Sequence, residues 1–113
     1  MTANNVTITE YSGFATVQGS LGQVLQMPML PALAEQAISV GASSVQSAAF
    51  NAKTAVIRIA VDAGSPVAFS AGANPTATVP SAGAGSARLA ENQTEYFCVP
   101  LGQSYKVALI QTT

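Results

Sequence analysis

The sequence predicts an all-β fold, an antiparallel β-sandwich or jelly roll with an extended N-terminal arm. Short stretches of alternating apolar and polar residues recur at intervals of about 8–12 residues, which is typical of small β-sandwiches. Turns rich in glycine, proline and asparagine separate them, and no stretch keeps the 3.6-residue period of an amphipathic helix. The chain has 113 residues, enough for one domain with its own core.

The strongest strand signal lies at residues 54–61, TAVIRIAV. Because side chains of a strand alternate between its two faces, one face of this stretch is wholly apolar and consists of Ala55, Ile57, Ile59 and Val61. β-Branched residues dominate the stretch, and a turn sequence at residues 62–66 ends it. We interpret it as a central strand on which the other strands assemble.

The N-terminal third, residues 1–33, predicts an edge strand followed by an arm, and residues 34–113 form the sandwich. Val6 and Ile8 alternate with threonines, which favours the edge strand. Residues 11–33 contain three glycines and two prolines, yet they are too apolar for a solvated linker. The segment either packs on its own domain or lies across a neighbouring subunit. Its candidate contact residues are Tyr11, Phe14, Val17, Leu21, Val24, Leu25, Met27, Met29 and Leu30.

The remaining elements are short. Residues 31–38 have helix-forming composition, but the alternation at residues 35–40 favours a strand there. Proline and glycine at residues 100–104 predict a hairpin turn between the last two strands, and residues 80–87, rich in alanine, glycine and serine, predict a flexible loop. The further strands are expected at residues 45–50, 67–69, 76–79, 95–99 and 105–110.

Charge is scarce along the whole chain. Four bases and five acids make up 8% of the residues, and the net charge is −1, whereas an ordinary domain has about a quarter of its residues charged. A chain with so little charge is poorly protected against association, which indicates assembly into an oligomer. Without a cluster of lysine or arginine, a nucleic-acid partner is not expected.

No catalytic or metal-binding pattern stands out. Histidine is absent, which removes Ser-His and Cys-His nucleophile systems and the commonest metal ligand. The five acids have no metal-ligand spacing, and a glycosidase pair of Glu91 and Glu95 would need a shaped cleft. Residues 83–88 contain two glycines of a phosphate loop but no following helix. We therefore expect no enzyme, no cofactor and no metal.

Two single residues carry expectations of their own. Cys98 lies in an apolar run, where an inert buried thiol is expected. Arg58 stands in the middle of the best strand, so it must face solvent or meet a carboxylate, because an unpaired buried charge is too costly. Glu95 is the expected partner of Arg58 in a structural ion pair.

Neither a signal peptide nor a membrane span is expected. The first ten residues lack a basic segment followed by a long apolar one, and no apolar run approaches the ~18 residues that a spanning helix needs. The sequence predicts a soluble protein that is made in a cytoplasm and has no membrane partner.

In several short segments the sequence resembles the small virion proteins of tailed bacteriophages, of the capsid decoration or head cement type. The segments are residues 8–11 (ITEY), 26–28 (QMP), 45–50 (VQSAAF), 54–59 (TAVIRI), 72–78 (GANPTAT), 95–97 (EYF) and 102–110 (GQSYKVALI). The resemblance implies a β-sandwich or jelly roll on the outside of the capsid that clamps adjacent major capsid subunits, often as a dimer or trimer. It also implies a place in the virion, assembled in the host cytoplasm, with residues 11–33 reaching a neighbour.

Two other functions remain open at the level of sequence. A virion surface or fibre-associated module that binds a host glycan would need exposed aromatic residues in a groove. A neck or tail-completion component would be another structural protein of the virion. The oligomeric state and the position on the capsid lattice are not fixed by the sequence.

Overall fold

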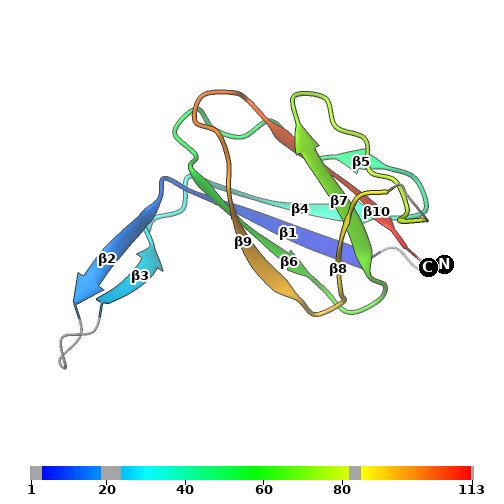
Figure 1. Cartoon of the computed structure of the whole chain (residues 1–113), viewed down its shortest axis with the longest axis horizontal. Helices are drawn as coiled ribbons and strands as arrows, with labels where there is room; N and C mark the ends of the chain where they lie inside the picture. The colour runs from blue at the N-terminus through cyan, green and yellow to red at the C-terminus, as the bar shows by residue number, and fades with distance from the viewer. Residues whose placement is uncertain (1–3, 19–23, 82–84, 113) are drawn as a thin grey trace.

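The computed structural model describes residues 4–18, 24–81 and 85–112, and over these residues the chain is all-β (Figure 1). Its strands are β1 (Asn4–Tyr11), β2 (Phe14–Gln18), β3 (Val24–Pro28), β4 (Ala34–Val40), β5 (Val45–Gln46), β6 (Val56–Val61), β7 (Val67–Gly72), β8 (Ala87–Leu89), β9 (Thr94–Cys98) and β10 (Lys106–Gln111). The predicted fold class, an all-β sandwich, is confirmed.

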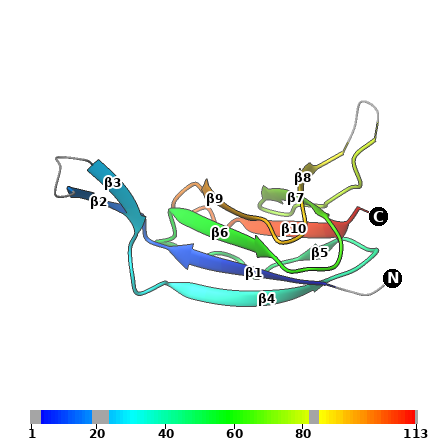
Figure 2. The same ribbon diagram turned by 90° about the horizontal axis from the view of Figure 1, so that it is seen from below.

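Two antiparallel sheets form the sandwich. The first sheet has the strand order β4-β1-β6-β9 and the second has the order β5-β10-β7-β8. Figure 2 shows the first sheet seen from below, with β4 at its free edge. Strands β2 and β3 pair only with each other and form a separate ribbon.

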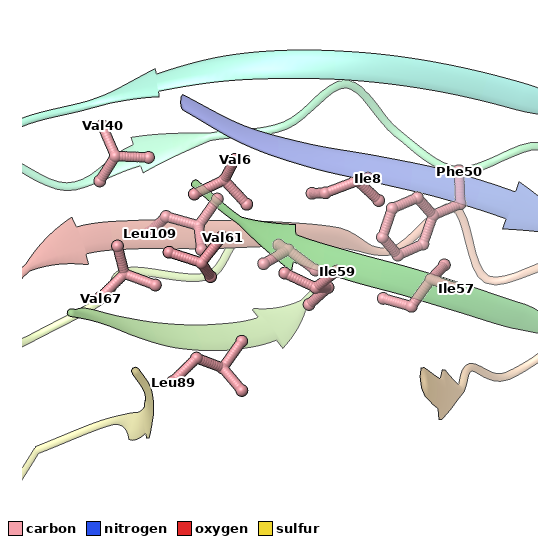
Figure 3. Close-up of a cluster of buried hydrophobic side chains, with 11 residues drawn as sticks. Val6, Ile8, Val40, Phe50, Ile57, Ile59, Val61, Val67, Leu89 and Leu109 are labelled. Carbon is pink, nitrogen blue, oxygen red and sulfur yellow. The ribbon is translucent and has the colours of Figure 1, made fainter. Parts of the chain in front are cut away.

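The core lies between the two sheets (Figure 3). Alternation places Val6 and Ile8 of β1 and Ile59 of β6 on the inner face, and all three are fully buried. The second sheet contributes Val67, Val107 and Leu109, which are equally buried. Burial of apolar side chains is the main driving force for folding. The apolar residues of the alternating strands therefore hold the two sheets together.

The first strand is not at an edge, contrary to the sequence expectation. β1 pairs with β4 on one side and with β6 on the other, so it is as central as β6. The alternation of Val6 and Ile8 shows that a strand has one buried face, but it does not show how many neighbours the strand has. The sandwich therefore includes β1 and does not begin at residue 34.

The expected irregular arm is a β-hairpin, and we call the ribbon of β2 and β3 the arm. Pairing between β1 and β4 runs from Asn4↔Val40 to Glu10↔Ala34, and pairing resumes in the arm at Phe14↔Pro28. The arm is thus the same two chain segments continued beyond the sandwich. Figures 1 and 2 both show it standing away from the body at the end of β1, which stretches the molecule to 47 Å along its longest axis.

The second half of the chain differs from expectation at three places. Residues 76–79 are not a strand, whereas Ala87–Leu89 forms β8 at the end of the expected loop. Of the stretch 45–50 only Val45–Gln46 is a strand. The segment between β9 and β10 is not a hairpin turn but crosses from the first sheet to the second, because proline and glycine mark a change of direction without fixing the strand that follows as a neighbour.

Candidate interaction surface

Large apolar side chains are exposed on the arm and at its base, and no other described strand pairs with β2 or β3. The side chains of Leu30 and Met27 are 79% and 53% exposed, and those of Met29 and Phe14 are also exposed. The register pairs apolar residues with each other across the arm, Ala15 with Met27 and Val17 with Leu25. A single two-stranded hairpin is marginally stable in water, and apolar residues on it gain stability only by contact.

An aromatic cluster ties the arm to the first sheet, and we call Tyr11, Phe14 and Tyr96 the root cluster. The ring centroids of Phe14 and Tyr96 lie 5.7 Å apart with an edge-to-face geometry, and those of Tyr11 and Tyr96 lie 6.5 Å apart. Rings in such geometry contribute about 0.5–1.5 kcal/mol per pair beyond their burial. Tyr11 is buried beneath the other two, whereas Tyr96 remains 44% exposed.

Backbone bonds brace the base of the arm. The Met29 N–H donates to the Gly13 carbonyl at 2.9 Å, and the Leu33 N–H donates to the Glu10 carbonyl at 2.7 Å. These bonds bridge the break between β1–β4 pairing and arm pairing. The arm is therefore held in direction at its base, even though the ribbon beyond has no covering layer.

A buried carboxylate anchors the strand from which the arm departs. Glu10 is 2% exposed, and its Oε1 accepts hydrogen bonds from the Asn51 N–H at 2.7 Å and from the Thr54 hydroxyl at 2.8 Å. Buried carboxylates are tolerated when donors satisfy them. Glu10 thus binds the loop before β6 to the end of β1, next to the root cluster.

The predicted contact residues fall into four groups. Phe14, Met27, Met29 and Leu30 are exposed on the arm or at its base, where a partner can reach them. Tyr11 is buried in the root cluster, so it supports the arm without facing solvent. Val17 lies in β2, and Val24 and Leu25 lie in β3. Leu21 lies outside the described residues. Sequence reasoning missed Tyr96, because its place beside the arm depends on pairing between distant strands.

The expected ion pair between Arg58 and Glu95 does not form. In the register of β6 with β9, Arg58 is opposite Tyr96 and Glu95 is opposite Ile59. Neighbouring positions of a strand point to opposite faces, so the two side chains lie on different sides of the sheet. Glu95 instead accepts a hydrogen bond from the Gln93 side chain at 2.9 Å.

Cys98 is exposed and not buried as the sequence suggested. β9 is the edge strand of the first sheet, and Cys98 is opposite Val56 on the face turned away from the core. We expect the native protein, studied as a dilute monomer, to react completely with one equivalent of a thiol reagent such as Ellman's reagent, without denaturant. Protection of the thiol until urea is added would contradict the exposure.

The described residues contain no pocket and no group of metal-ligating side chains. Over the same part of the chain, no helix has the length and apolar character to cross a bilayer. The apolar arm and its root cluster are therefore the feature on which a functional argument rests. No protein-family model, curated protein or solved structure matches the chain.

Proposed function

We propose that this protein is a structural, non-enzymatic virion protein that binds the outer surface of a phage capsid and clamps adjacent major capsid subunits. The observation that carries the proposal is the arm, which stands away from the sandwich (Figure 1), with Met27 exposed on β3 and Leu30 exposed at its base. A free-standing monomer gains nothing from such a ribbon, whereas a clamp needs an apolar contact that reaches beyond its own body. The resemblance to decoration proteins described above supports the same role.

In the proposed mechanism the protein acts by binding to capsid subunits and catalyses no reaction. A shell that holds packaged DNA is under outward pressure, and a bridge between two subunits resists by burying surface that exists only in the assembled lattice. A specific contact buries about 800 Å² on each partner. Repetition over many lattice positions adds the contacts together through multivalency. In this mechanism the sandwich is a rigid body that positions the arm, and the arm makes the contact with the capsid.

Reconstitution on particles tests the proposal. Purified capsids that lack this protein are incubated with increasing amounts of the recombinant chain, and bound protein is measured after sedimentation and located by electron microscopy. We expect saturable binding at repeated lattice positions and a higher temperature of capsid disruption. Binding at a single vertex would indicate a neck or tail component instead, and absence of binding to capsids would overturn the proposal.

A glycan-binding module is the alternative that a specific observation favours. Tyr96 and Phe14 expose aromatic rings next to each other at the base of the arm, and sugars stack on such rings. A glycan site would normally be concave, and the described residues contain no pocket. Binding of the chain to host cells or glycan arrays, without binding to capsids, would replace the clamp by this alternative.

A further inference from the structure

Among the described residues, no other sheet packs on the outer face of the first sheet, which is turned away from the core and carries the root cluster at one end. The second sheet packs on the other face, where the core cluster lies (Figure 2). The register places four residues in one row across the outer face, Glu35 of β4, Thr9 of β1, Arg58 of β6 and Tyr96 of β9. The next row consists of Ala37, Thr7, Ala60 and Thr94.

The two rows carry two charged side chains of opposite sign, Glu35 and Arg58. Each lies one strand away from β1, on opposite sides of it, so about 10 Å separate their backbones. Arg58 has Thr9 and Tyr96 as its neighbours in the row, and neither is negative. Glu35 accepts only a long hydrogen bond, 3.3 Å from the Thr9 hydroxyl. The charges are thus placed symmetrically about β1.

This arrangement is complementary to itself. A twofold axis in the interface, parallel to β1, places β4 of one copy over β6 of the other while keeping each residue at the same height along the strands. Glu35 of each copy then faces Arg58 of the other. We infer that a second copy of this chain docks on the outer face of the first sheet, forming a face-to-face dimer with two equivalent Arg58–Glu35 ion pairs. Self-complementary patches of this kind are what a twofold interface requires.

The size of the surface is that of a small dimer interface. Four strands spaced about 4.8 Å apart, with about six residues each at ~3.4 Å, give a flat footprint near 20 Å by 20 Å. This flat footprint of about 400 Å² is smaller than the ~800 Å² that a standard interface buries per partner, so the contact belongs with the small, reversible interfaces. The face also carries Tyr96 and Arg58, and tyrosine and arginine are residue types enriched at energetically dominant positions of interfaces.

The same axis brings the two arms to one end of the dimer. Rotation about a line parallel to β1 leaves the direction of that strand unchanged, so both arms leave from the same end, next to the root clusters of both copies. The inference does not use the capsid, and it stands or falls independently of the proposed function. If the function holds as well, each dimer presents two arms in the same direction.

Charge reversal and charge exchange test the dimer. The full chain is studied alone by sedimentation velocity over a range of concentrations, as wild type, as Glu35→Lys, as Arg58→Glu and as the double variant. We expect each single reversal to weaken the dimer at least about tenfold, because it places like charges against each other twice. The double variant should restore dimerisation to near the wild-type level, since the exchanged charges are again complementary.

Matched controls separate this effect from a general change of charge. Glu95→Lys changes the net charge equally on the inner side of the same sheet, and Arg88→Glu does so on β8 of the second sheet; both should leave the dimer unchanged. Thermal unfolding by circular dichroism shows that each variant is folded. A wild-type chain that stays monomeric at high micromolar concentration would overturn the inference. So would single reversals that leave the dimer affinity unchanged, or a double variant whose dimer affinity stays as low as that of the single variants.

Discussion

Replacing Met27 and Leu30 together by serine is expected to abolish saturable capsid binding while leaving the fold intact. Both side chains are largely exposed, so the free energy of unfolding should change by no more than about 0.5 kcal/mol. Anchors of an interface contribute about 2 kcal/mol or more each, so losing two should weaken binding to the capsid about 100-fold or more. Quantitative co-sedimentation with capsids measures the affinity, and urea unfolding measures the stability.

A control variant is available in a loop away from the arm. Val79 is also an exposed apolar residue, 47% accessible, but it lies on the loop between β7 and β8. Val79→Ser should therefore bind capsids as the wild type does. Equal loss of binding in both variants would indicate a general dependence on apolar surface, and undiminished binding of the Met27→Ser/Leu30→Ser variant would show that the arm does not make the contact with the capsid.

Replacing Glu10 by alanine should destabilise the fold by about 2–4 kcal/mol. The substitution leaves the Asn51 N–H and the Thr54 hydroxyl without the carboxylate that accepts their hydrogen bonds, and a buried unsatisfied donor costs about 1–3 kcal/mol. Glu10→Gln keeps an acceptor oxygen at the same place, so it should cost only about 1 kcal/mol. The midpoints of urea unfolding at neutral pH measure both changes.

The comparison between the two variants is the informative part. A neutral acceptor that recovers most of the lost stability would show that hydrogen bonding at the end of β1 matters more than the negative charge. If Glu10→Ala unfolds at the same urea concentration as the wild type, the anchor between β1 and the loop before β6 contributes nothing to stability.

The sequence was most informative where one face of a strand is buried. Alternation at residues 54–61 predicted β6 and its inward residues Ile57 and Ile59, because a strand against a core must keep a period of two. The same rule found most of β4, β9 and β10. It did not reveal that β1 is internal, nor that β9 and β10 belong to different sheets, since alternation reports burial and is silent about neighbours.

The candidate surface was predicted only in part. Composition alone picked out the apolar residues of the arm, but the partner of the arm at its base, Tyr96, is more than eighty positions along the chain from Phe14, and only the strand pairing brings them together. Glu10 was missed for a similar reason. Its donors lie 41 and 44 residues away, and a single acid in a strand looks solvent-exposed until the loop that covers it is known.

The contact between the start of β1 and the end of β10 has a consequence for orientation. The side chain of Gln111 donates to that of Asn4 at 2.7 Å, and the Thr112 N–H donates to the Pro66 carbonyl, so the start of β1 and the end of β10 lie side by side at the pole opposite the arm (Figure 1). The start of β1 and the end of β10 are therefore both remote from the arm. In the proposed function the arm contacts the capsid, so this pole faces away from the capsid surface.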